Sequence, residues 1–242
     1  METQHRSYTR VWDDFLCNRN IILLSISFIL IHAIFVILHN FAPEFLIALT
    51  YEDGWLENTS ALMYLAASLL FAATFWYGSN LKNRLWAVAF SLGFFILAGE
   101  EASWGQRFLG YRVEAVEAIN RQGEFNLHNL PFLHGDTWNT TRLLTVASLL
   151  FGVFLPLLLS ASATVRRVLI GKFHFPAPHP VIGVCFMLSW LWYKLYHPTS
   201  NIPMGVEESR ETTIALGMFV YAVLIWRSKW HLSTSFETQP PR

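Results

Sequence analysis

The sequence predicts an all-α membrane protein, a bundle of about six transmembrane helices. Hydrophobic residues make up 53% of the 242-residue chain and charged residues only 14%, whereas soluble domains carry roughly 25% charged residues. The apolar residues also come in unbroken runs, without the spacing of an amphipathic helix or strand. The formal net charge is zero, so bulk charge gives no indication of a nucleic-acid partner.

Apolar runs of about 20 residues, the length that crosses a bilayer, occur along most of the chain. The fifth is short, and the sixth begins with a carboxylate. The expected spans are Asn20–His39, Asn58–Gly78, Leu85–Trp104, Leu143–Ala163, Val181–Leu195 and Glu211–Trp226. We therefore expect a cytoplasmic N-terminal segment (1–19), one helical membrane domain (20–227) and a disordered cytoplasmic tail (228–242).

The orientation follows from lysine and arginine, which are enriched in cytoplasmic loops. These residues gather in the N-terminal segment, in the second and fourth loops and in the C-terminal tail, for example at Arg19, Lys82, Arg166 and Arg227. Both termini are thus predicted to be cytoplasmic, which places the odd-numbered loops outside. Acidic residues and histidines concentrate in these outer loops, so we expect a polar site at the extracytoplasmic face.

One candidate for that site is the segment Gly99–Arg107, which contains Glu100 and Glu101. Glu100 would lie roughly 22 Å along a helix that starts at Leu85, inside a hydrocarbon core of about 30 Å. A carboxylate there must be protonated, paired or facing water. In one interpretation, Glu100 and Arg107 form a structural ion pair. In the other, one glutamate pairs with Arg107 while the second faces a polar cavity as a general base or ligand.

The third loop contributes Glu124 and His128, four residues apart. This spacing places both side chains on one face of a helix, and zinc and iron commonly take such a pair as ligands. An exposed Glu–His pair on an amphipathic helix is the alternative. The polar neighbours Gln122, Asn126 and Asn129 favour the site.

Two further helix starts carry glutamates. Glu208 and Glu211 are three residues apart, and Glu57 precedes Asn58. Acids in a first turn are also explained by the helix dipole, with Arg210 neutralising one and with Asn58 or Ser60 capping the other helix. Helix ends at one face lie within roughly 10 Å of their neighbours, so we expect the glutamates to converge. The predicted ligands of a divalent metal ion are Glu57, Glu124, His128, Glu208 and Glu211.

Two resemblances accompany these segments. Glu100–Arg107 and Glu124–Asn129 resemble segments of uncharacterised multi-pass membrane proteins that share a Gly-Glu-Glu-x-Ser-Trp-Gly-Gln-Arg motif, which implies no particular activity. Trp55–Ser60 is similar to a short stretch of the alkaline ceramidase-like membrane hydrolases, which implies site roles for Glu57 and Asn58. The zinc-binding histidines and the seven helices of that family have no counterpart here.

The function that we predict is a membrane-embedded enzyme, assisted by a divalent metal, that acts on a lipid or lipid-linked substrate. Glu100 or Glu101 would be the general base or a ligand, and a metal would lower the pKa of a bound water. Arg107 would hold a glutamate in place or bind a substrate phosphate. The alternatives are a proton-coupled transporter, whose carboxylates would relay protons, and a non-catalytic membrane scaffold.

Overall fold

The computed structural model describes residues 18–51, 54–78, 80–120, 125–127, 130–131 and 139–237. The elements of regular structure in these residues are all helices, which confirms the all-α class. Four helical segments are long and apolar enough to cross a membrane: Arg19–Phe41 in α2 (Asn18–Phe41), α4 (Trp55–Tyr77), α5 (Leu81–Glu101) and Thr140–Ala161. The last combines α8 (Thr140–Leu149), the π-helix η3 (Leu150–Phe154) and α9 (Leu155–Ala161). These spans are compatible with an integral membrane protein.

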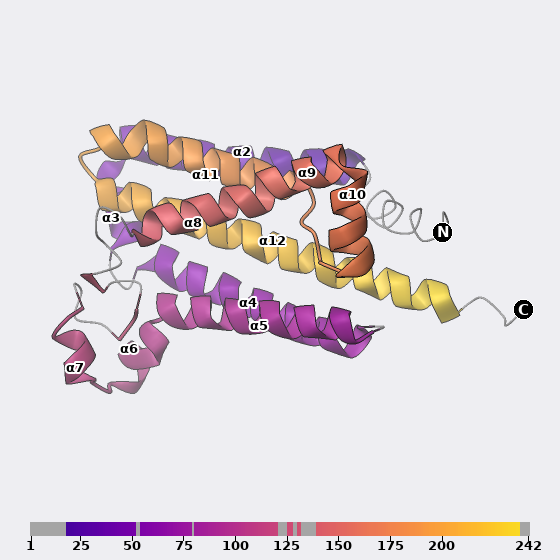
Figure 1. Cartoon of the computed structure of the whole chain (residues 1–242). Coiled ribbons are helices and arrows are strands. Elements are labelled where there is room, and N and C mark those ends of the chain that lie inside the picture. Colours follow the sequence, from indigo (N-terminus) through magenta and orange to yellow (C-terminus); the bar gives the residue numbers. More distant parts are fainter. Residues whose placement is uncertain are drawn as a thin grey trace, which may run out of the picture.

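The other two expected spans lie in helices of unusual length. α11 (Val181–Tyr196) has 16 residues, and α12 (Pro203–Glu237) has 35. α12 packs against α4 and α11, and α11 packs against α2 (Figure 1). The shorter elements are α3 (Pro43–Thr50), η1 (Ser103–Gly105), α6 (Gln106–Leu109), α7 (Glu114–Glu117), α10 (Ala163–Arg166), η4 (Arg167–Lys172) and η5 (His197–Thr199).

The apolar side chains of the spans largely face outward. Ile29, Leu30 and Ile37 of α2 each expose about half of their surface. Soluble proteins rarely expose contiguous apolar patches larger than a few hundred Å², whereas in a membrane apolar side chains can contact lipid chains directly. The outward faces therefore suit a bilayer, and several polar side chains, such as His32 and Ser189, are buried inside the bundle.

Inside the bundle, glycines let the helices approach closely. A Cβ atom on Gly152 of η3 would lie 2.2 Å from the Phe186 ring, and one on Gly217 of α12 would lie 2.5 Å from the same ring. A Cβ on Gly183 of α11 would lie 2.6 Å from the Gly152 carbonyl oxygen. Pro156 lies four residues after Gly152. The ring of a proline in a helix clashes with the carbonyl group of the residue four positions before it. The π-turn of η3 lies where this crowding occurs.

Hydrogen bonds between side chains link α2, α11 and α12. His32 Nε2 lies 3.3 Å from Ser189 Oγ, which lies 2.6 Å from Thr213 Oγ1. All three side chains are buried. Near the other end of α2, His39 Nε2 lies 2.8 Å from Ser200 Oγ. Polar contacts of this kind join helices where lipid removes the usual hydrophobic driving force.

The bundle has two chemically different ends. α2 begins and α12 ends at the same end, which also holds α10 and the turn between α4 and α5 (Figure 1). Basic residues lie here, and Lys82 Nζ donates a hydrogen bond of 2.7 Å to the Lys172 carbonyl oxygen. The starts of α4, α8 and α12 lie at the opposite end. The expected topology across a membrane and the cytoplasmic assignment of the basic end stay predictions.

Candidate functional site

Glutamates from three helices gather at the end of the bundle where α4 and α12 begin. Glu208 of α12 lies within electrostatic range of Glu57 on α4 and of its own neighbours Glu207 and Glu211. Tyr64 lies about two helical turns beyond Glu57 on α4. It is within electrostatic range of both Glu101 and Glu211. We call Glu57, Glu101, Glu207, Glu208 and Glu211 the acidic cluster. Glu57 and Glu211, two of the expected site residues, thus lie within electrostatic range of Glu208, and Glu101 shares Tyr64 as a neighbour with Glu211.

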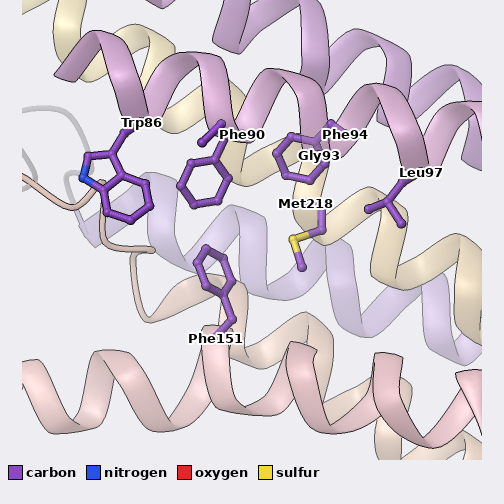
Figure 2. Close-up of a pocket in the computed structure, with 8 residues that line it drawn as sticks. Trp86, Phe90, Gly93, Phe94, Leu97, Phe151 and Met218 are labelled. Atoms are coloured by element: carbon purple, nitrogen blue, oxygen red, sulfur yellow. The ribbon is translucent and has the colours of Figure 1, made fainter. Parts of the chain in front are cut away.

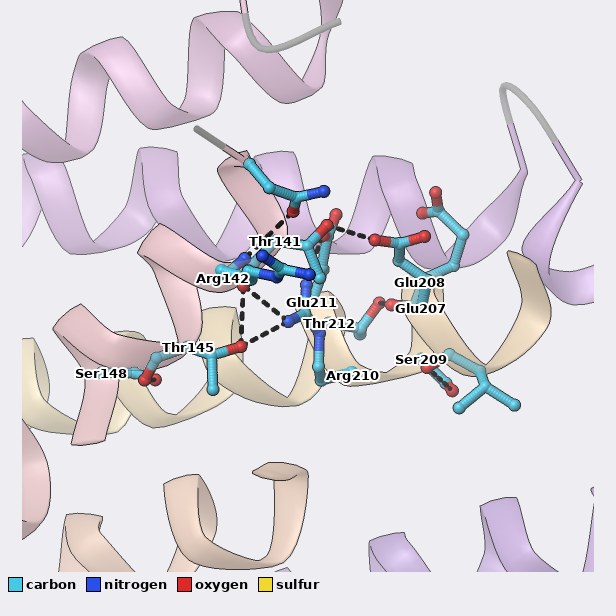
Figure 3. A network of polar contacts seen from close by, with 12 residues as sticks. Thr141, Arg142, Thr145, Ser148, Glu207, Glu208, Ser209, Arg210, Glu211 and Thr212 are labelled. Atoms are coloured by element: carbon cyan, nitrogen blue, oxygen red, sulfur yellow. Dashed lines mark hydrogen bonds and ion pairs between the residues drawn. The ribbon is translucent and has the colours of Figure 1, made fainter. Parts of the chain in front are cut away.

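Arg210 lies fully buried beside this cluster. Its Nη1 donates hydrogen bonds to the Thr141 carbonyl oxygen at 3.0 Å and to Thr145 Oγ1 at 2.6 Å, while its Nη2 pairs with Glu211 Oε1 at 2.6 Å (Figure 3). The guanidinium carbon also lies 4.8 Å from the centre of the Tyr193 ring. The planar fork of arginine suits several acceptors at once. Arg210 therefore joins α8, α11 and α12 and fixes the Glu211 carboxylate.

Further hydrogen bonds hold the cluster's helices in place. Thr141 Oγ1, in the first turn of α8, donates to Glu207 Oε1. Ser60 of α4 donates to Thr212 Oγ1 of α12 at 3.1 Å. Thr212 Oγ1 in turn lies 2.9 Å from the Glu208 carbonyl oxygen. The N-terminal part of α12 is thus bound to the first turn of α8 through Glu207 and to α4 through Thr212.

Glu208 precedes the expected sixth span and lies outside the four apolar helices. Burial, reinforced by the negative charges of Glu211, Glu57 and Glu207, raises the pKa of Glu208 to about 9. At neutral pH this carboxyl group holds its proton, whereas Glu211 forms an ion pair with Arg210. Two carboxyl groups in different protonation states are what general acid–base catalysis requires.

Glu57 reaches the cluster because α4 begins earlier than expected. The helix starts at Trp55 and its N-cap position is Gly54, which makes no side-chain cap. Asn58 and Ser60 lie inside the first turns and donate to the carbonyl oxygens of Gly54 and Leu56, each at 2.9 Å. The expectation that Asn58 or Ser60 caps this helix was wrong.

The two adjacent glutamates of α5 have different surroundings. Glu100 is buried, and its carboxylate accepts hydrogen bonds from Trp104 Nε1 at 2.7 Å and from the Leu127 backbone nitrogen at 2.6 Å. Gln106 Oε1 accepts from the Phe125 backbone nitrogen at 2.6 Å. Glu100 and Gln106 therefore hold the segment 125–127 against the end of α5. Glu101, in contrast, belongs to the acidic cluster.

The backbone after α5 turns sharply, so the helix ends at Glu101 and the expected span to Trp104 is too long. Ser103 and Trp104 have φ of 45° and 54°, and Gly105 has φ of 80°. Non-glycine residues rarely adopt this left-handed region. The turn folds the Trp104 indole back over Gly99, where a Cβ would lie 2.8 Å from the ring. Much of the Gly-Glu-Glu-x-Ser-Trp-Gly-Gln sequence is thus explained by this turn.

The remaining predicted site residues fall outside what the structure describes. Glu124 and His128 lie among the residues that are not described, and so does the side chain of Arg107. Within the described part of the chain, no group of three or more His, Cys, Asp or Glu side chains is arranged to hold a metal ion. The predicted divalent metal and its predicted ligands, including the Glu124–His128 pair, stay predictions.

The sequence analysis predicted too small a role for the residues around the acidic cluster. Arg210 was expected only to neutralise a neighbouring acid, and Thr141, Thr145 and Tyr64 were not expected at all. Thr141 and Thr145 stand four residues apart in α8, which is the spacing of two side chains on one helix face. Polar residues at that spacing, at the acidic end of a span, were the available signal.

Comparisons of the chain with protein-family models, with curated proteins and with solved structures found no match. The two resemblances drawn from the sequence therefore stay predictions, together with the roles that they imply for Glu57 and Asn58. What the protein does has to be argued from the geometry and the charge of the acidic cluster.

Proposed function

We propose that this chain is a membrane-embedded enzyme that cleaves a bond in the polar part of a membrane lipid by general acid–base catalysis. The observation that carries the proposal is that Glu208 lies within electrostatic range of Glu57 on α4, beside the buried Arg210 that pairs with Glu211. Glu57, Glu101, Glu207, Glu208 and Glu211 are only partly buried, so a lipid headgroup or water can reach them. Ionisable residues at such a position are costly and commonly functional.

In the proposed reaction, Glu211 is the base and Glu208 the acid. A water oxygen forms a bond to the carbonyl carbon or phosphorus of the lipid while Glu211 takes a proton from that water. The bond to the leaving oxygen breaks, and that oxygen receives the proton of Glu208. Arg210 is a positioning residue that orients Glu211, because its contacts with Thr141 and Thr145 leave it fixed.

The test is turnover by the purified protein in vesicles that contain defined phospholipids and neutral lipids, with products identified by mass spectrometry. Changing Glu211→Gln or Glu208→Gln should lower turnover by about 10²–10⁴-fold, the usual contribution of a general acid or base. Glu44→Gln is the matched control, because Glu44 is an exposed glutamate on α3. Activity that survives both cluster substitutions, or no product from any lipid, would contradict the proposal.

One observation favours a proton-coupled carrier as the second candidate. The buried line His32–Ser189–Thr213 leads from the interior of the bundle to Thr213 Oγ1, which donates to the Arg210 carbonyl oxygen at 2.8 Å. Such a line could pass protons between the bundle interior and the cluster. The His32→Ala substitution distinguishes the candidates: it should abolish proton uptake by a carrier in vesicles and leave the lipid cleavage of an enzyme largely intact.

A further inference from the structure

An apolar groove lies between α5, η3 and α12 (Figure 2). Its volume is about 370 Å³, and its lining follows α5 from Trp86 to Leu97, with Phe151 of η3 and Met218 of α12 on the other sides. Gly93, midway along the α5 wall, has no atom within 4 Å of the position that a Cβ would take. The protein's own side chains therefore leave this part of the groove unfilled.

The groove has the length of one lipid chain and lies on a helix that faces lipid. From Trp86 to Leu97 the helix rises by about 16 Å, which is about half of a hydrocarbon core of roughly 30 Å. The α5 wall belongs to one of the four apolar spans. Leu92, Phe95 and Ile96 on the same helix are about half exposed. In a bilayer the groove is thus at the depth of the acyl chains of one leaflet.

Two exposed lysines lie beside the Trp86 end of the groove. Trp86 Nε1 donates a hydrogen bond of 2.9 Å to the carbonyl oxygen of Phe173, and the Lys172 ammonium lies 5.7 Å from the centre of the Phe173 ring. Lys82 Nζ donates a hydrogen bond of 2.7 Å to the Lys172 carbonyl oxygen. Lys82 also precedes Trp86 by four residues, the spacing of two side chains on one helix face. These contacts place both ammonium groups next to the end of the groove.

The positive charge at this end is not balanced by the segments that form it. Segments 76–90 and 160–181 contain no aspartate or glutamate, and their basic residues are Lys82, Arg84, Arg166, Arg167 and Lys172. Within the residues that the structure describes, neither Lys82 nor Lys172 pairs with a carboxylate. An ammonium group has three donors, and the carbonyl oxygen of Lys172 occupies one donor of Lys82. An anionic group therefore complements this end of the groove.

We infer that the groove binds one acyl chain of a phospholipid with a net negative charge, whose phosphate group lies at Lys82 and Lys172. Phosphate oxygens accept charge-assisted hydrogen bonds from ammonium groups, and basic residues at a membrane surface attract anionic lipids. A phospholipid without net charge fits the apolar groove but gains less from the two lysines. The site lies at the opposite end of the bundle from the acidic cluster (Figure 1), so it is independent of the proposed function.

The experiment uses the full chain in phosphatidylcholine vesicles with a trace of phosphatidylglycerol that carries a photoreactive diazirine in one acyl chain. A parallel sample contains phosphatidylcholine with the same photoreactive chain. After illumination, labelled residues are mapped by mass spectrometry. We expect phosphatidylglycerol to label Phe90 and Phe94, which line the groove, about fivefold more strongly than phosphatidylcholine does, which is the effect of one basic residue near an anionic headgroup.

Variants separate the headgroup contacts from the chain contacts. Lys82→Gln combined with Lys172→Gln should remove the preference for phosphatidylglycerol, whereas Lys82→Arg should retain it. The matched control is Lys194→Gln, because Lys194 is an exposed lysine of α11 next to Tyr193, whose ring contacts Arg210 at the other end of the bundle. Salt at about 1 M should also reduce the preference, because it screens exposed charges, and this measurement needs no variant.

Gly93→Leu fills the groove and should lower the labelling of Phe90 and Phe94 by both lipids; Gly93→Val serves if the leucine variant does not fold. A second apolar hollow of about 370 Å³ between α4 and α12 is the reference for chance contact, and Leu69 in its lining should be labelled equally by both lipids. A preference that is as strong at Leu69, or that survives the double lysine variant, overturns the inference. Equal labelling of the groove by both lipids, or labelling that Gly93 variants leave unchanged, does the same.

Discussion

Two segments of this chain look alike in sequence and differ in the structure. Each has adjacent glutamates followed by an arginine: Glu100 and Glu101 before Arg107, and Glu207 and Glu208 before Arg210. At the end of α5, Glu100 is occupied with the Trp104 indole and a backbone nitrogen. At the start of α12, Glu208 lies within electrostatic range of Glu57 on α4. What lies opposite a carboxylate, more than its own motif, decides its role.

The largest expected effect concerns the α12 segment. Arg210→Met should destabilise the protein by about 3–5 kcal/mol, the usual cost of removing one partner from a buried pair, because Glu211 loses its counter-charge and α8 loses two hydrogen bonds. Thermal unfolding in detergent micelles measures this. Adding Glu211→Gln should recover part of the loss. The exposed Arg19 at the start of α2 is the control, and Arg19→Met should change stability by less than about 0.5 kcal/mol.

A smaller effect separates the two glutamates of α5. Glu100→Gln should lower stability by about 1–3 kcal/mol, because an amide cannot accept both hydrogen bonds and leaves a buried donor unpaired. It should also speed proteolysis near residues 125–127. Glu101→Gln leaves both of these hydrogen bonds of Glu100 in place, and should leave proteolysis near residues 125–127 unchanged. If both variants unfold at the temperature of the wild type, the anchoring role of Glu100 is wrong.

The smallest effect tests the turn after α5. Gly99→Ala should cost about 1 kcal/mol or more, because the new methyl would lie 2.8 Å from the Trp104 ring and overpacking is destabilising. Gly93→Ala on the same helix has no atom within 4 Å, and should instead stabilise by up to about 1 kcal/mol through helix propensity. Opposite signs in thermal unfolding support the packed turn. Two shifts of the same sign contradict it.

The fold class was predictable because lipid imposes one strong rule. Long apolar runs must form helices there, since every backbone group needs an internal partner. The start of α4 was misjudged by three residues, because Asn58 resembles a cap although Gly54 takes that position. The end of α5 was misjudged because the left-handed turn at Ser103 and Trp104 has no counterpart in hydropathy.

The site was predictable only in part. The glutamates at helix starts could be placed at one end, because neighbouring helices bring their ends together. The sequence could not predict which of the two adjacent glutamates enters the site. That depends on Trp104 and on the backbone nitrogen of Leu127, which lies 27 residues further along the chain and contacts the end of α5. The apolar groove between α5, η3 and α12 could not be predicted from the sequence either. Phe151 and Met218 are ordinary apolar residues, and only the packing of three helices brings them together.

The hydrogen bond between His32 and Ser189 has a consequence for how α2 tolerates change. α2 is apolar on nearly every side, so the bilayer accepts it in any rotation about its own axis. The polar contacts of His32 and His39 select one rotation. Inserting one residue between the start of α2 and His32 would leave the hydropathy of α2 almost unchanged. The insertion would turn the two ends of the helix by about 100° relative to each other. For α2, the number of residues before His32 therefore matters as much as the identity of the two histidines.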